Sequence, residues 1–128
     1  MAGNTPSGGN GLFGRKILLV EDNFMVGMSL RKTIEELGCT VVGPIASVRE
    51  AERLASETDV DACVLDINII GGTSVGVAER MGAKGTPVIF VTGYGSPRAL
   101  PEAMVKVPRL NKPVDERGLE EALRRAIG

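Results

Sequence analysis

Acidic side chains follow two apolar segments of this sequence, at the points where strands would end. Glu21 and Asp22 come directly after the apolar run 16–20, and Asp66 follows a second run at 62–65. If the two strands are parallel, their carboxyl ends lie at the same edge of a sheet, and the three carboxylates meet there. Two unit charges about 4 Å apart interact by ~4 kcal/mol at an effective dielectric constant near 20. Three acids this close therefore need compensating positive charge.

A lysine and a threonine stand at the ends of two further apolar segments. Thr92 follows the run 87–91, and Lys112 lies in the tripeptide Asn-Lys-Pro. Lys112 supplies one positive charge, which leaves the predicted site with roughly two negative charges. Mg²⁺ suits such a site, because it prefers oxygen ligands, needs few carboxylates and keeps several waters. The backbone carbonyl of Asn68, two residues beyond Asp66, is a further candidate for the metal shell.

A magnesium site of this kind usually accompanies phosphate. In phosphoryl transfer the protein mainly positions the reacting groups and neutralises charge on the phosphoryl oxygens. Asp66 is then the candidate nucleophile, and it would form an aspartyl phosphate. Lys112 is expected to pair with one phosphoryl oxygen, and the Thr92 hydroxyl to donate to another. Asp66, Thr92 and Lys112 are the predicted catalytic residues.

Composition excludes several other kinds of chemistry. The chain has 128 residues, a formal net charge of −1 and no histidine. The lack of histidine removes Ser-His-Asp catalysis, histidine bases and most zinc sites. The balanced charge argues against a nucleic-acid partner, which would require a basic excess. Cys39 and Cys63 each fall in an apolar segment and are interpreted as buried free thiols.

The N-terminal segment differs in composition from the rest of the chain. Residues 1–14 are rich in Gly, Asn and Ser and are predicted to form a flexible tail, with a single domain at 15–128. The segment lacks the basic start and apolar stretch of a secretory signal. No apolar run approaches the ~20 residues that are needed to span a bilayer. A cytoplasmic protein without a membrane partner is expected.

Strand-like and helix-like patterns alternate five times along the chain. Apolar runs predict strands at 16–20, 39–43, 62–65 and 87–91, and a short edge strand within 105–111, which contains Pro108. Pro44 is expected to end the second strand. Each strand is followed by a predicted helix, the fourth short or irregular, with Ser47 and Asp115 as two N-caps. The alternation favours a parallel sheet with helices on both faces, of strand order 2-1-3-4-5.

Four motifs give the chain a family resemblance that covers about residues 15–128. The pair Glu21-Asp22 after a strand, CVLDIN around Asp66, VIFVTG around Thr92 and NKP around Lys112 resemble the receiver domain of two-component response regulators. The resemblance implies a flavodoxin-like (βα)5 three-layer sandwich, Mg²⁺, and phosphotransfer to Asp66 from a sensor histidine kinase or a histidine phosphotransfer protein. It also implies a self-phosphorylating and self-dephosphorylating signalling domain, not a turnover enzyme.

The resemblance further implies roles within the site. Asp22 and Asp66 would contact the metal directly, and Glu21 would act more through water. Thr92 would move toward the phosphoryl group and remodel the face formed by the fourth helix, fifth strand and fifth helix. In receivers the peptide before the proline of this motif is often cis, which is expected for Lys112–Pro113.

One segment is similar to a subgroup of alphaproteobacterial receivers, in which the fourth strand reads Phe-Ala-Thr-Gly followed by Tyr. Residues 90–94 read Phe-Val-Thr-Gly-Tyr, with Val91 in place of Ala. The similarity implies kinases of the HWE or HisKA2 type. The chain departs from many receivers at Arg109, where an aromatic ring usually couples to the threonine. Tyr94, the one tyrosine of the chain, is a candidate for that role.

The leading hypothesis is a single-domain response regulator, monomeric or weakly dimeric, that acts through a downstream protein partner or as a phosphate sink. The alternative is a receiver-like module that binds partners without phosphorylation. A third hypothesis, a magnesium-dependent phosphatase with an aspartate nucleophile, lacks its general acid, because Asn68 is not acidic, and lacks a substrate cap. The glycine-rich segment 71–76 is interpreted as a flexible loop without a phosphate-binding role, since no Lys-Ser/Thr follows it.

Overall fold

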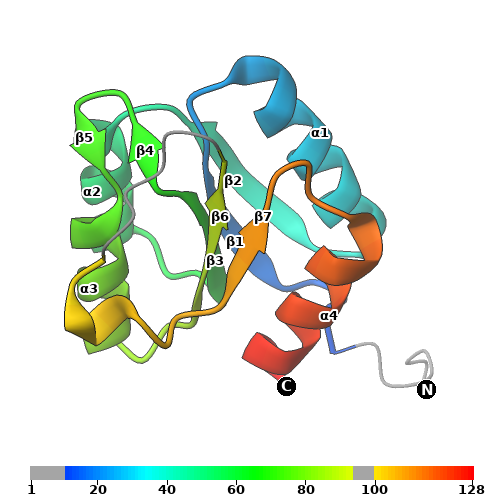
Figure 1. Cartoon of the computed structure of the whole chain (residues 1–128). Helices are drawn as coiled ribbons and strands as arrows, with labels where there is room; N and C mark the ends of the chain where they lie inside the picture. Colours follow the sequence, from blue (N-terminus) through cyan, green and yellow to red (C-terminus); the bar gives the residue numbers. More distant parts are fainter. Residues whose placement is uncertain (1–10, 94–99) are drawn as a thin grey trace.

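A parallel sheet of five strands forms the centre of the molecule (Figure 1). The computed structural model describes residues 11–93 and 100–128. From one edge of the sheet to the other, the strands are β2 (Thr40–Ile45), β1 (Lys16–Val20), β3 (Ala62–Asp66), β6 (Val88–Thr92) and β7 (Arg109–Asn111). When the two short strands β4 and β5 are left out and the remaining five strands are numbered along the chain, the order is 2-1-3-4-5, as predicted. The flavodoxin-like fold is confirmed.

Helices cover both faces of the sheet. Figure 1 shows α1 (Phe24–Glu36) and α4 (Glu116–Ile127) on one face, and α2 (Val48–Glu57) and α3 (Val75–Ala83) on the other. Side chains of the central strands alternate between two apolar cores. Leu18 and Leu65 pack on the α2–α3 side, whereas Leu19 and Val64 pack on the α1–α4 side. Because both faces are buried, β1 and β3 read as continuous apolar runs.

Three helices begin at side chains that accept a hydrogen bond from the first turn. Asn23 accepts from the Val26 amide at 2.9 Å in α1. Ser47 caps α2 with a bond of 3.3 Å from Glu50, and Asp115 caps α4 with a bond of 3.1 Å from Gly118. The Ser47 and Asp115 caps were predicted. The N-cap of α1 is Asn23, so neither Glu21 nor Asp22 is needed to cap this helix.

Strand β2 continues past Pro44, contrary to the prediction that this proline ends it. A proline is tolerated here because β2 is an edge strand and its pairing with β1 shifts register between Leu18 and Val20. Gly43 adopts φ +119°, and a Cβ at this position would lie 2.3 Å from the Leu19 carbonyl oxygen. Only glycine fits this approach. The Gly43–Pro44 peptide is cis, as is Lys112–Pro113, where this was expected.

The segment predicted as a flexible loop is a small hairpin. Strands β4 (Asn68–Ile69) and β5 (Gly72–Thr73) pair antiparallel. The turn between them is attached to the start of α2, because the Val48 amide donates to the Ile70 carbonyl at 2.9 Å and the Ile70 amide to the Ala46 carbonyl at 3.1 Å. The chain that leaves β3 is therefore tied to the neighbouring loop.

Two other segments refine the predicted boundaries. Residues 11–14 were assigned to the tail, but Leu12 is 1% exposed in the α1–α4 core, and the Gly14 amide donates to the Gly38 carbonyl at 2.8 Å. The fourth helical position contains the short 3-10 helix η1 (Glu102–Met104), and strand β7 follows at the sheet edge, as predicted. Among residues 11–93 and 100–128, no helix has the length and apolar character to cross a membrane.

Candidate functional site

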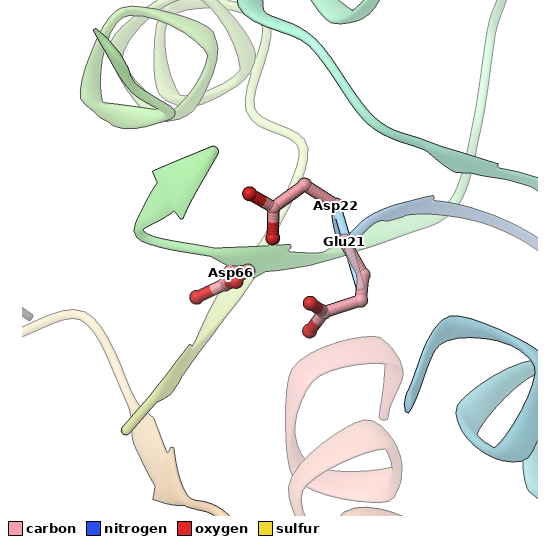
Figure 2. A group of neighbouring side chains, drawn as sticks. All are labelled: Glu21, Asp22 and Asp66. Carbon is pink, nitrogen blue, oxygen red and sulfur yellow. The ribbon is translucent and has the colours of Figure 1, made fainter. Parts of the chain in front are cut away.

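The carboxyl ends of β1 and β3 bring three acids together. The two strands pair in parallel with Val20 opposite Leu65, so the residues that follow them lie at the same level of the sheet. Glu21, Asp22 and Asp66 each offer a carboxylate oxygen within 4.8 Å of the other two. Figure 2 shows the Glu21 and Asp22 carboxylates on opposite sides of the chain that carries them, with Asp66 beside both. The predicted convergence of the acids is present.

Glu21 is the most enclosed of the three acids. Its side chain is 0% exposed, and Oε2 accepts a hydrogen bond of 3.0 Å from the Asn23 amide. Its Oε1 is also buried and meets the Lys112 ammonium at 2.9 Å, without the alignment of a regular hydrogen bond. Burial without the positive charge would be costly, since an unpaired buried carboxylate loses its hydration. Glu21 is therefore held in place by the turn and by Lys112.

Lys112 reaches both strand ends from the opposite edge of the site. Its Nζ lies 3.2 Å from Asp66 Oδ2 as well as 2.9 Å from Glu21 Oε1. The Lys112 amide donates to the Thr92 carbonyl at 2.7 Å, which extends the pairing of β6 with β7 to this residue. Burial lowers the pKa of Lys112, but the close polar contact with Glu21 and the charges of Asp66 and Glu21 outweigh it and raise that pKa. The ammonium is thus protonated at neutral pH.

The surroundings of Asp66 disfavour its charged form. Burial, and next the charge of Glu21, raise the pKa of Asp66 from 3.8 to about 6, although Lys112 lowers it. A single ammonium is therefore too little positive charge for this cluster. Asp22 is exposed and leaves the cluster open to solvent on its side. Clustered hard oxygen donors, excess negative charge and an open approach are the features that fit Mg²⁺.

The carbonyl of Asp66 is held independently of its carboxylate. The buried Ser74 hydroxyl donates to the Asp66 carbonyl oxygen at 2.7 Å, which fixes the turn from β3 into the β4–β5 hairpin. Asn68, the fourth predicted metal ligand, lies in β4 and is half-buried. Ser74 was not singled out from the sequence, because a serine in a glycine-rich segment carries no signal of a partner eight residues earlier.

Thr92 lies at the end of a strand, as predicted, and its hydroxyl has a protein partner that was not predicted. It ends β6, beside the strand that carries Asp66, since Asp66 pairs with Val91. Its hydroxyl donates to the side-chain oxygen of Asn111 at 3.0 Å. Asn111 is the register partner of Thr92 on β7 and was missed by the sequence analysis. The register of this short edge strand would have been the only signal, and Pro108 left that register undetermined.

The residues proposed for an aromatic switch are only partly described. Arg109 is exposed at the start of β7, so no aromatic side chain stands at this position of the edge strand. Tyr94 lies outside the described residues. A hollow of about 280 Å³ at this end of the sheet is lined by Thr92, Gly93, Asn111 and Lys112.

Comparisons with known proteins agree with this architecture. A family model described as the response regulator receiver domain matches residues 17–124. The solution structure of SdrG from Sphingomonas melonis Fr1 is similar, with 31% identity, a TM-score of 0.76, and coverage of 91% of this chain and 98% of that one. The receiver domain of a modulated diguanylate cyclase from Desulfovibrio desulfuricans G20 shares 28% identity, with a TM-score of 0.73 and coverage of 89% and 94%.

A curated relative is similar over a shorter region. The phyllosphere-induced regulator PhyR of Methylorubrum extorquens is 34% identical over 82 residues, which are 62% of this chain and 31% of that protein. The chain thus spans about a third of this relative.

Proposed function

The chain belongs to the response regulator receiver domain family, and from this premise we propose that it accepts a phosphoryl group on Asp66 from the phosphohistidine of a sensor kinase. A carboxylate oxygen of Asp66 attacks phosphorus, the phosphorus–nitrogen bond breaks, and the histidine leaves and takes up a proton. Asp66 ionises with a pKa of about 6, so its nucleophilic form predominates at neutral pH. The product is an aspartyl phosphate on this chain.

The observation that supports this proposal best is the position of Asp66. It is 6% exposed, it lies in a cluster with two further acids, and its Oδ2 contacts an ammonium at 3.2 Å. When bound by Glu21, Asp22, Asp66 and the Asn68 carbonyl, Mg²⁺ supplies positive charge to the phosphoryl oxygens. Lys112 already lies beside Asp66 Oδ2 and pairs with a phosphoryl oxygen there. A carboxylate with only a structural role needs no such surplus of acids.

The helix α1 carries exposed apolar side chains beside the acidic cluster. Phe24, Met25 and Met28 of this helix are 72%, 78% and 43% exposed, an unusual concentration of large apolar side chains on a surface beside a charged site. A groove between α1 and α4 reaches from Met25 to Lys112 and Pro113. We assign this surface to the kinase or phosphotransfer protein. The similarity of residues 90–94 to the strand-four motif of alphaproteobacterial receivers favours a kinase of the HWE or HisKA2 type.

The output of the phosphorylated form is binding to a downstream protein, with phosphate storage as the second use. The face around η1, β7 and α4 lies next to Thr92 and is the region that a change at Thr92 reaches first. Phosphorylation then alters affinity for the partner and does not turn over a substrate.

The test is intact-mass spectrometry after incubation with acetyl phosphate and Mg²⁺. The wild-type protein is expected to gain one phosphoryl group that hydroxylamine removes, as it does from an acyl phosphate. Asp66→Asn is expected to gain none, while Asp59→Asn, the same change at an exposed acid, gains it as the wild type does. A wild-type protein that remains unmodified with both acetyl phosphate and a cognate kinase would favour the phosphorylation-independent binding module.

A further inference from the structure

We propose that Asn111 is a positioning residue that holds Thr92 in the resting orientation and thereby opposes capture of the phosphoryl group. This inference rests on the proposed function of Asp66. Its basis is the hydrogen bond of 3.0 Å from Thr92 Oγ1 to Asn111 Oδ1, between the last residues of β6 and β7. No feature of the phosphorylation chemistry itself requires this bond.

The Thr92 hydroxyl has one proton to donate. A hydroxyl that donates to Asn111 cannot at the same time donate to a phosphoryl oxygen. Asp66 pairs with Val91, so Thr92 lies on the neighbouring strand and one residue further along. Adjacent strands are about 4.8 Å apart, which brings a phosphoryl group on Asp66 within reach of the hydroxyl once it turns away from Asn111. The two partners of Thr92 therefore compete.

Asn111 also connects Thr92 to the position of Lys112. Asn111 and Lys112 are consecutive, and the Lys112 amide is bonded to the Thr92 carbonyl at 2.7 Å. Lys112 Nζ meanwhile contacts Asp66 at 3.2 Å. The end of β7 thus holds Thr92 through a side chain and through the backbone, and holds Asp66 through the next side chain. A shift of Lys112 toward a phosphoryl oxygen would strain the Asn111–Thr92 bond.

In this chain β7 gives Thr92 a polar partner, whereas many receivers couple this threonine to an aromatic ring. Arg109 is exposed and belongs to the same three-residue strand, so β7 offers Thr92 an amide in place of a ring. A single hydrogen bond of a partly exposed hydroxyl changes an equilibrium by about two- to tenfold. Asn111 is expected to set the fraction of molecules in which Thr92 is available, and not to decide whether Asp66 reacts at all.

The first measurement concerns the metal-free protein and needs no phosphoryl group. Three-bond NMR couplings report the χ1 angle of Thr92 in EDTA. A single rotamer is expected in the wild type, and averaging between rotamers in Asn111→Ala. Asn111→Asp keeps an acceptor oxygen and is expected to keep the single rotamer. Thr92 couplings that are the same in Asn111→Ala as in the wild type would overturn the proposal.

The second measurement is the affinity for beryllium fluoride, a phosphoryl mimic, at fixed Mg²⁺ by calorimetry. Asn111→Ala is expected to lower the dissociation constant about two- to tenfold, because Thr92 no longer has to break a hydrogen bond to Asn111 before it binds the mimic. The same change made in a Thr92→Val protein is expected to alter the constant less than twofold. An equal effect in both backgrounds would assign Asn111 a general structural role and overturn the proposal.

The two possible failures are distinguishable. If neither the wild type nor Asn111→Ala binds beryllium fluoride, the proposed function of Asp66 fails. If the wild type binds it and Asn111→Ala binds equally well or more weakly, only the role of Asn111 fails.

Discussion

Replacing Asp66 by asparagine is expected to stabilise the metal-free protein. The pKa of Asp66 is raised from 3.8 to about 6, mainly by burial and next by Glu21, so the folded state prefers the neutral carboxyl. About two pKa units correspond to about 3 kcal/mol at pH 7.5. Asparagine has nearly the same shape as the neutral acid. We expect a gain of about 1 to 3 kcal/mol, or about 4 to 12 °C in Tm for a domain of this size.

The pH dependence of this gain has a definite sign. A carboxyl whose pKa is higher in the folded state than in the unfolded state costs nothing below pH 3.8, because it is protonated in both states. The cost grows as pH rises between 3.8 and about 6 and is constant above that window. The advantage of Asp66→Asn should therefore be complete at pH 7.5 and fall to about a third at pH 4.5.

Urea unfolding in EDTA at these two pH values measures the effect. Asp59→Asn is the matched control, since Asp59 is exposed, and its stability should stay within about 0.5 kcal/mol of the wild type. Equal stability of Asp66→Asn and wild type at pH 7.5, or a gain that does not change with pH, would refute the electrostatic account of the site.

Three further perturbations address the same site and its support. Lys112→Met is expected to destabilise the metal-free protein by about 2 to 3 kcal/mol in urea unfolding, because Glu21 and Asp66 lose their cation. Lys106 is exposed, so Lys106→Met is expected to leave stability unchanged. Equal effects of the two substitutions would argue against the ion pairs. Mg²⁺ at ten times its Kd should stabilise the wild type by about 1.4 kcal/mol in thermal unfolding, and should stabilise Asp66→Asn much less. An equal gain in stability for both proteins would place the metal elsewhere. Gly43→Ala is expected to lower the free energy of unfolding by about 2 kcal/mol, because Gly43 has a φ of +119° and lies close to the backbone of Leu19. Gly82 lies in open space on α3, so Gly82→Ala is expected to be neutral or stabilising. A Gly43→Ala protein as stable as the wild type would contradict the close approach.

The sequence predicts the acidic cluster because two physical rules coincide there. Apolar runs of strand length that end in acids mark the carboxyl ends of buried strands, and alternation with helices makes those strands parallel. Glu21, Asp22 and Asp66 then meet for reasons of topology alone. Lys112 follows for the same reason from the last strand.

The features that sequence reasoning missed depend on neighbours in space. Pro44 lies within β2 because this strand is at the sheet edge and shifts register, neither of which a single segment reveals. Leu12 is buried although it belongs to the glycine-rich N-terminal segment, because α1 and α4 leave an apolar position that it fills. The partner of Thr92 depends on the pairing of three residues of β7 with β6.

The most direct measurement of the central claim identifies the residue that carries the phosphoryl group. The protein is phosphorylated with acetyl phosphate and Mg²⁺ and then reduced with borohydride, which converts an aspartyl phosphate to homoserine. Peptide sequencing by tandem mass spectrometry locates that homoserine. Our account predicts it at position 66 and nowhere else. Homoserine at Asp22 or another acid, in place of Asp66, would contradict it.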